Sequence, residues 1–195
     1  MEQGGTRLYG KMSKVLQLLP IGSPEPELID WLRSEIMDGF KIDCRLISPA
    51  LEPSFCYHPE RKQYHSSELL QGIASLVDSD TWRVLGVTQL DLYVPILTFV
   101  FGEAELGGHC AVVSYHRLRQ EFYGLPEDRD LLAERLLTES IHEIGHTLEM
   151  THCTDHRCVM SSSHAVEWID IKQHTFCNHC ARRAAVHSKR SRAVR

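Results

Sequence analysis

Two histidines four residues apart, with a glutamate directly after the first, constrain this chain more than any other feature of its sequence. The motif H-E-I-G-H occupies residues 142–146, inside a segment whose apolar residues recur at helical spacing. Residues four apart share one face of a helix, so His142 and His146 can reach a single metal ion. Zinc accepts imidazole nitrogens at about 2.0–2.1 Å. The chain therefore needs a helix that turns this face toward a cavity large enough for the ion.

A third histidine and the glutamate complete the pattern of a catalytic zinc site. Glu143 can reach a water on the ion and take its proton, and zinc lowers the pKa of such a water to about 7. His152 follows the expected end of the helix, where a turn could return a third nitrogen to the ion. Three protein ligands and one open position are typical of catalytic zinc. Two alternatives stay open: a helix with two surface histidines and an ordinary glutamate, or a His152 that is solvated or binds another metal.

Four of the seven cysteines crowd into the C-terminal part of the chain. Cys153 and Cys158 form one short-spaced pair and Cys177 and Cys180 another, and two such pairs make a closed tetrahedral site. We predict a structural zinc that stabilises a lobe too short to build its own core. A redox role for Cys177 and Cys180 is less favoured, because no strand leads into this C-x-x-C. Spare ligands are His156, His174 and His179, and the other cysteines, expected to pack as small hydrophobic residues, are Cys44, Cys56 and Cys110.

Length, composition and charge are those of one globular domain. The chain has 195 residues, of which 43% are hydrophobic and 24% charged, enough to build a sizeable core. Its net charge of −5 does not favour a nucleic-acid partner. Residues 181–195 are the exception, with six basic residues and no acid. We expect there a frayed, solvated terminus rather than an anion-binding segment.

No segment marks the chain for export or for a membrane. The apolar stretch from Val15 to Leu19 is too short for a signal sequence and ends at Pro20. No apolar run approaches the roughly 18 residues of a membrane span. We therefore expect a cytoplasmic monomer in a reducing compartment, in which cysteines stay thiols or bind metal.

Apolar periodicity and turn residues predict an α/β fold of the α+β kind. Early strands alternate with helices, which favours a largely parallel sheet, and the short turn at Gly107-Gly108 makes one strand near its edge antiparallel. The longest helix has Pro126 as its first residue and carries the 142–146 motif near its end. We expect strands at 15–19, 42–47, 82–90, 97–101 and 110–115, helices at 26–39, 67–77 and 126–148, and a long loop at 48–64.

The chain divides at the end of this helix, where it becomes rich in Cys, His and Ser. We predict an upper lobe at residues 12–149, which includes the metal-binding helix. A lower lobe at residues 150–180 holds the third histidine and the four cysteines. Residues 181–195 form the basic tail, and the first eleven residues are expected to be loose. The two lobes together make a single catalytic domain.

These motifs resemble those of a known family. The segments similar to the archaemetzincin signature are H-E-I-G-H at 142–146, His152-Cys153, Cys158-Val-Met160 and Cys177-Asn-His-Cys180. Upstream segments are similar to the family as well: Arg61–Tyr64, Val87–Val94 and Phe99–Gly102. The resemblance covers most of residues 14–180, and neither the basic tail nor the first eleven residues belongs to it.

The resemblance implies a metzincin-like architecture and a peptidase. A twisted mixed sheet with helices would form the upper lobe, above a small, irregular lower lobe held by zinc. The three histidines would hold a catalytic zinc, Glu143 would be the base in aminopeptidase-like peptide hydrolysis, and the four cysteines would hold a second zinc. Met160 would stand in a tight Met-turn beneath the zinc histidines. The strand from Ala111 to Tyr115 would be the edge that pairs with an extended peptide.

One position departs from the family pattern. Glu149 stands where metzincins have a glycine that ends the helix at positive φ and lets the third histidine swing in. A non-glycine residue there costs about 1 kcal/mol, so Glu149 could adopt another turn or point into the site. Ser161–Ser163 also lacks the tyrosine that some metzincins place after the Met-turn. A peptide-binding protein with a weak or vacant catalytic site is therefore the alternative function, and a nucleic-acid module built on the cysteine zinc and the basic tail is the least favoured.

Overall fold

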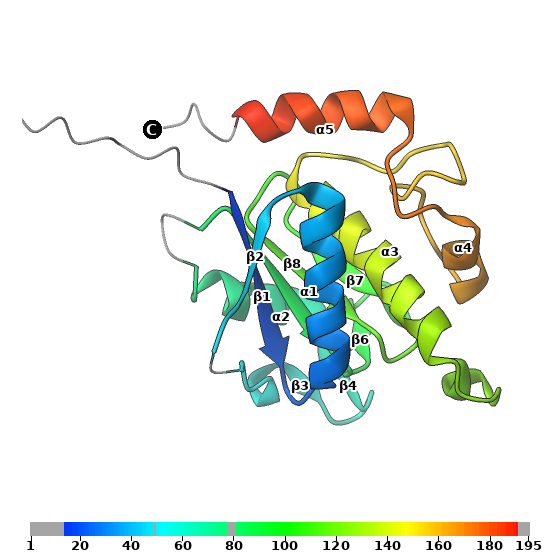
Figure 1. Ribbon diagram of the computed structural model, residues 1–195. Coiled ribbons are helices and arrows are strands. Elements are labelled where there is room, and N and C mark those ends of the chain that lie inside the picture. Colours follow the sequence, from blue (N-terminus) through cyan, green and yellow to red (C-terminus); the bar gives the residue numbers. More distant parts are fainter. Residues whose placement is uncertain (1–13, 49, 78–80, 191–195) are drawn as a thin grey trace, which may run out of the picture.

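A five-stranded mixed sheet forms the centre of the computed structural model, which describes residues 14–48, 50–77 and 81–190 (Figure 1). Its strands lie in the order β2-β1-β5-β8-β7. The first four run parallel to one another, and β7 at the edge runs antiparallel to β8. The prediction of a largely parallel sheet with one antiparallel strand across the Gly107-Gly108 turn is therefore confirmed. The strand bounds are β1 Val15–Ile21, β2 Asp43–Leu46, β5 Arg83–Thr88, β7 Gly102–Ala104 and β8 Cys110–Ser114.

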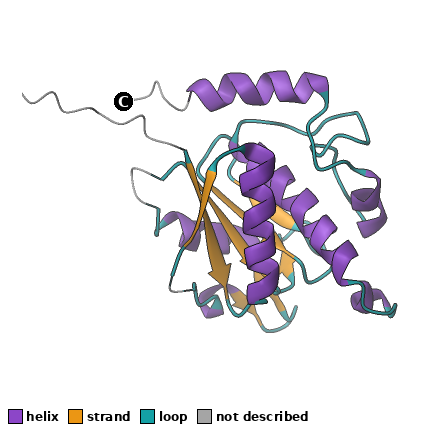
Figure 2. Cartoon of the chain, in the orientation of Figure 1, coloured by secondary structure: helices purple, strands orange, loops and turns teal. Residues whose placement is uncertain are grey.

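Helices cover both faces of this sheet, because neighbouring residues of a strand point to opposite faces. The helices are α1 Pro26–Phe40, α2 Ser66–Ala74 and α3 Arg129–Thr147. Ala111 and Val113 of β8 face the core formed with α1 and α3, whereas Cys110 and Val112 face the core formed with α2. Figure 2 shows α1 crossing in front of the strands. Strand β8 is thus buried on both faces, which is why its sequence is an unbroken apolar run.

A second, three-stranded sheet occupies part of the segment expected to be a long loop. Its strands are β3 Tyr57–His58, β4 Gln63–His65 and β6 Leu92–Tyr93, and a short 3-10 helix, η1 Ser54–Cys56, precedes them. The prediction of a loop at 48–64 is wrong in this part, because strands of two or three residues are too short to show alternation. The strand expected at 97–101 is also wrong: the edge strand begins at Gly102, and Val100 makes only an isolated bridge to Leu92.

The long helix α3 begins at Arg129, three residues later than expected. Asp128 is its N-cap, and the carboxylate accepts a hydrogen bond of 2.9 Å from the Leu131 N–H. Pro126 therefore lies before the cap and is not the first helical residue. A side-chain cap satisfies a free N–H group, which a proline at the same point cannot do. A short 3-10 helix, η2 Gln120–Tyr123, leads into this start.

Two further helices, α4 Val166–Ile171 and α5 Asn178–Arg190, complete the fold. Helix α5, drawn in red in Figure 1, includes residues 181–190 of the basic tail, so the expected frayed terminus is wrong for them. Cys180 and Ala184, four residues apart, bury one face of its first turns in the core. The expected loose segment 1–11 lies outside the described residues, and the division into lobes stays a prediction. No helix within the described ranges is long and apolar enough to cross a membrane.

Candidate active site and cysteine cluster

The last two turns of α3 and the loop after them bring together the three histidines predicted as ligands. His142 and His146 lie one turn apart, and their Nε2 atoms are 3.1 Å from each other. The ring centroid of His152 is 5.3 Å from that of His142 and 5.1 Å from that of His146. One nitrogen of each imidazole lies within 4.8 Å of the others. This spacing suits three ligands of one ion.

Backbone carbonyls orient two of these rings. His142 Nδ1 donates to Val159 O at 2.8 Å, and His146 Nδ1 donates to Met150 O at 2.7 Å. A carbonyl oxygen can only accept, so the proton is on Nδ1 and the Nε2 lone pair is left for a metal. Burial lowers the pKa of His142 well below its ordinary value, which keeps the ring in the neutral form that binds metal. The donor set therefore fits zinc.

Glu149 adopts the backbone conformation that a glycine would have at this point, with a φ of 63°. Its N–H donates to His146 O at 3.0 Å, which turns the chain away from the helix axis. The side chain lies beside Gly107 in the β7–β8 turn, and the Gly107 N–H also donates to His146 O, at 2.9 Å. Glu149 therefore makes the turn expected of a glycine and does not line the cavity, and His152 still reaches the other two histidines.

The histidines line a cavity of about 660 Å³ between α3 and the edge of the main sheet. Residues 97–104 form the opposite wall, and residues 162–164 lie on a third side. The edge strand in this wall is β7, because β8 lies between β5 and β7. The expectation that Ala111–Tyr115 is the free edge is therefore wrong: the hairpin adds one more strand beyond β8. Strand β7 has N–H and C=O groups on its outer side that an added strand could pair with.

Glu143 is buried in the cavity where its side chain meets β7. A Cβ atom at Gly102 would lie 2.6 Å from Glu143 Oε1, closer than real side chains approach. Only glycine lets the edge strand come this near the carboxylate. Burial, and then the negative charge of Glu139, raises the pKa of Glu143 well above its ordinary value. Sequence reasoning missed Gly102 as a site residue, although it ends one of the segments that resemble the family.

A buried ion pair lies next to Glu143 and joins α3 to the residue that follows α4. Lys172 Nζ is 2.8 Å from Glu139 Oε1, and the two side chains are 0% and 4% exposed. Burial raises the pKa of Glu139, and the attraction of Lys172 acts in the opposite direction. Glu139 lies one helical turn before Glu143 and lines the same cavity. Sequence reasoning missed the pair: the spacing of the two glutamates was a signal for Glu139, but no pattern marks Lys172.

Met160 lies in a tight turn packed against α3. The Ser161 N–H donates to Cys158 O at 2.9 Å, which closes the turn. The Met160 side chain is fully buried, and its sulfur lies against Gly145, between the two histidines of the helix. This arrangement places the Met160 sulfur against the turn of α3 that carries the histidines, and the Met-turn role of Met160 stays a prediction.

The four cysteines form a second cluster, and none of them lines the cavity. Their sulfur atoms all lie within 4.8 Å of one another. Cys153 Sγ and Cys177 Sγ are 3.8 Å apart, far longer than the about 2.05 Å of a disulfide bond. A backbone hydrogen bond from Cys180 lowers the pKa of the Cys177 thiol, whereas burial raises the pKa of the Cys158 and Cys180 thiols. Four sulfur ligands in one closed group suit a structural zinc ion.

Comparison with known proteins adds an independent line of evidence. A family model described as Peptidase family M54 matches residues 50–185. The chain belongs to this family. An archaemetzincin from Methanocaldococcus jannaschii is 40% identical over 164 residues, which cover 84% of this chain and 89% of that protein. An archaemetzincin from Pyrococcus furiosus is 36% identical over 178 residues, which cover 88% of this chain and 93% of that protein.

Solved archaemetzincin structures share the fold. The structure from Methanopyrus kandleri matches with a TM-score of 0.79 at 32% identity and covers 93% of this chain and 99% of its own. The structure from Archaeoglobus fulgidus, complexed with malonate, matches with a TM-score of 0.75 at 35% identity. The match covers 87% of this chain and 99% of that chain. The predicted fold class and the resemblance to archaemetzincins are thus confirmed. This M54 peptidase is a zinc metallopeptidase, and it carries two side-chain clusters that suit a metal ion.

Proposed function

We propose that this M54 peptidase hydrolyses peptide bonds at a zinc ion held by His142, His146 and His152, with Glu143 as the general base. The observation that carries the proposal is the convergence of three imidazoles and one buried carboxylate on a single cavity. Three protein ligands leave a coordination position for water or substrate, which distinguishes a catalytic zinc from a structural one.

Each residue of the site has a part in this reaction. When bound, zinc supplies a Lewis acid that polarises the substrate carbonyl and makes water more acidic. Glu143 accepts the proton released by the attacking water and returns it to the amine of the departing product. An extended peptide pairs with the outer side of β7 through main-chain hydrogen bonds. Gly102 leaves the Glu143 carboxylate directly beside that strand.

A second, structural zinc ion at the four cysteines is part of the proposal. Cys153 directly follows His152, and Cys177 and Cys180 lie at the start of α5. An ion here would therefore tie the loop of the third histidine to α5. Zinc analysis of the purified protein should give two ions per chain. One ion per chain, with the cysteines filled, would favour the alternative of a peptide-binding protein. That alternative arose because Glu149 stands in place of the expected glycine.

Glu143→Ala tests the proposed base. The variant should retain its zinc and lose about 10²–10⁴-fold of the hydrolysis rate, because only the proton acceptor is removed. Glu134→Ala is the matched control, since Glu134 lies on the same helix with a side chain that is 54% exposed. The assay is zinc-dependent cleavage of a mixed peptide library. Equal cleavage by Glu143→Ala and the wild type would contradict the assignment.

We also propose aminopeptidase-like specificity. A further carboxylate, Glu103, lines the cavity beside Glu143, where the hydroxyl groups of Ser66 and Ser67 hold it in place. Carboxylates bind a free α-amino group by charge-assisted hydrogen bonds. Peptides with a free N-terminus should therefore be cut faster than their acetylated copies. Equal rates on both would reject this specificity without affecting the role of Glu143. A monomeric state and a cytoplasmic location stay predictions.

A further inference from the structure

The cavity wall opposite the histidines begins with a segment that is not part of the main sheet. Residues 97–99 line the cavity, but β7 begins only at Gly102. Leu97 is 50% exposed, and the backbone here forms a turn. Something other than strand pairing must therefore hold this part of the wall in place.

We propose that Arg61 is a positioning residue that fixes residues 97–99 as a preformed subsite for the peptide substrate. The proposal rests on the proposed peptidase function, because it assigns this wall to the binding of the peptide. Arg61 lies between β3 and β4 in the second sheet, behind the wall, and does not line the cavity.

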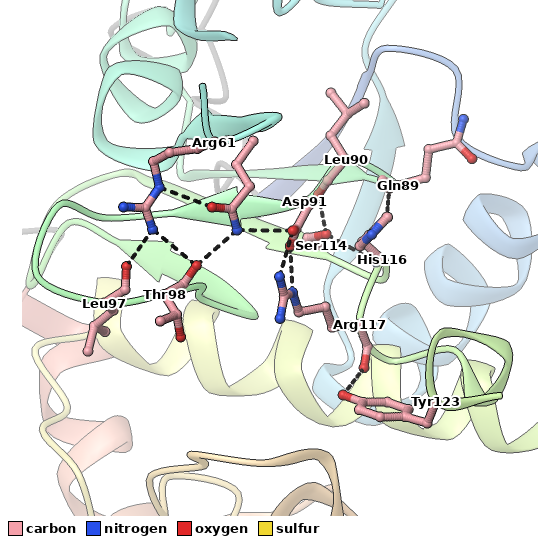
Figure 3. Close-up of polar contacts among 11 residues, drawn as sticks. Arg61, Gln89, Leu90, Asp91, Leu97, Thr98, Ser114, His116, Arg117 and Tyr123 are labelled. Carbon is pink, nitrogen blue, oxygen red and sulfur yellow. Dashed lines mark hydrogen bonds and ion pairs between the residues drawn. The ribbon is translucent and has the colours of Figure 1, made fainter. Parts of the chain in front are cut away.

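The guanidinium of Arg61 is held on several sides (Figure 3). Its Nη2 donates to Leu97 O at 3.0 Å and to Thr98 O at 3.2 Å. Its Nε donates to Gln63 Oε1 at 3.1 Å, and its central carbon lies 4.2 Å from the centre of the Tyr93 ring. A planar fork can satisfy these partners together, whereas the ammonium of a lysine has neither the stacking plane nor the spread of donors.

The network continues behind the wall and extends the support to Phe99. Gln63 Nε2 donates to Thr98 O at 2.9 Å and to Asp91 Oδ2 at 3.0 Å. Asp91 in turn binds Arg117 through both oxygens, at 2.7 and 2.8 Å, and its side chain is only 14% exposed. The Arg117 guanidinium carbon lies 4.3 Å from the centre of the Phe99 ring. Three consecutive wall residues are thus held by side chains from outside the cavity.

This arrangement has a consequence for substrate binding. The carbonyls of Leu97 and Thr98 already accept hydrogen bonds from Arg61, so they are engaged from behind while the side chains of this segment border the cavity. If the wall is already fixed before the substrate binds, binding does not include the entropy cost of ordering the wall. Loss of the support should therefore weaken the binding of ligands that contact the wall and leave zinc binding unchanged.

The test compares Arg61→Lys with Arg45→Lys as a matched control. Arg45 lies on β2 at the other edge of the sheet, where its side chain is 67% exposed and pairs with Asp43. Two probes of the zinc-loaded proteins are used: acetohydroxamate, too small to reach the wall, and a leucine-containing peptide hydroxamate. In Arg61→Lys the Kd of the peptide hydroxamate should rise about tenfold, and that of acetohydroxamate should change by less than about twofold. Arg45→Lys should leave both unchanged.

A second measurement separates this inference from the peptidase proposal. The Leu97 N–H donates to Val94 O at 3.0 Å, and the Val100 N–H donates to Leu92 O at 2.9 Å. Hydrogen exchange at these two amides should accelerate in Arg61→Lys, while exchange in α3 stays the same. This readout needs no turnover, so it decides the role of Arg61 even if no peptide is cut. Unchanged exchange with unchanged peptide-hydroxamate affinity, or an equal loss for both probes, would overturn the proposal.

Discussion

The turn after α3 contains a strain that a single substitution should remove. Glu149 has a φ of 63°, in the left-handed region that disfavours residues with a Cβ. Glu149→Gly and Glu149→Ala both remove the carboxylate, but only glycine removes the Cβ. The difference between the two variants therefore reports the backbone alone.

The expected magnitude follows from two opposing effects. A Cβ in the left-handed region destabilises the alanine variant by about 1–2 kcal/mol. Glycine loses more conformational freedom on folding than alanine, which reduces its advantage by about 0.5–1 kcal/mol. Glu149→Gly should thus be more stable than Glu149→Ala by about 1 kcal/mol, or about 2–4 °C in Tm for a chain of this size. The hydrogen bonds that hold the turn, to His146 O from Glu149 and Gly107, involve no metal. The gain should therefore appear as stability and not as zinc affinity.

Urea denaturation of the chelator-treated and zinc-loaded proteins measures the stability, and competition with a chelator measures the zinc affinity. Lys41 provides the control, because it caps the C-terminus of α1 with a φ of 52°, and glycine there should exceed alanine by a similar amount. The reasoning is refuted if the two Glu149 variants are equally stable while the two Lys41 variants differ. It also fails if glycine at 149 raises the zinc affinity about fivefold without a gain in stability, because the turn would then form only with the metal.

Two further predictions concern buried groups. Lys172→Met should destabilise the protein by about 3–5 kcal/mol, because it leaves the Glu139 carboxylate buried without its partner. Adding Glu139→Gln should restore part of this stability. An unchanged urea midpoint for Lys172→Met would contradict the prediction. The thiol of Cys110 has a pKa raised by burial from 9.0 to about 11, so its contribution to stability is complete below pH 9 and is lost as the pH rises toward 11, where the unfolded thiol is already ionised. Stability should therefore fall less steeply between pH 9 and 11 in Cys110→Ala than in the wild type.

Features carried by one element, or by short spacings, were predictable from the sequence. His142 and His146 lie on a single helix, so their common direction follows from a periodicity of 3.6 residues. The apolar run of β8 and the Gly107-Gly108 turn likewise placed a hairpin at the sheet edge. The bounds of α3 were less accurate, because Pro126 and Asp128 both mark a helix start and only the cap geometry decides between them.

Features that depend on contacts between distant segments were not predictable. The order of β7 and β8 depends on which side of the hairpin meets the rest of the sheet. The sequence placed the outer strand at the apolar residues 97–101, whereas the strand that pairs with β8 is Gly102–Ala104, with Glu103 at its centre. Lysine is a residue type that usually lies at the surface. The burial of Lys172 follows only from the position of Glu139, 33 residues earlier. One sequence contains no signal for such a pair.

The contacts of Arg61 with the wall of the proposed substrate site could not be predicted from the sequence either. Its partners at Leu97 and Thr98 are backbone carbonyls, which every residue has, so no residue type at 97 or 98 could have pointed to it. The resemblance of Arg61–Tyr64 to the family marked the segment without giving a reason. The hydrogen bonds of Arg61 suggest how a side chain that does not line the cavity can still influence its shape, by holding the main chain of the wall from behind. Residues that shape a substrate site in this way have to be sought through the hydrogen bonds of its backbone and not among its lining side chains.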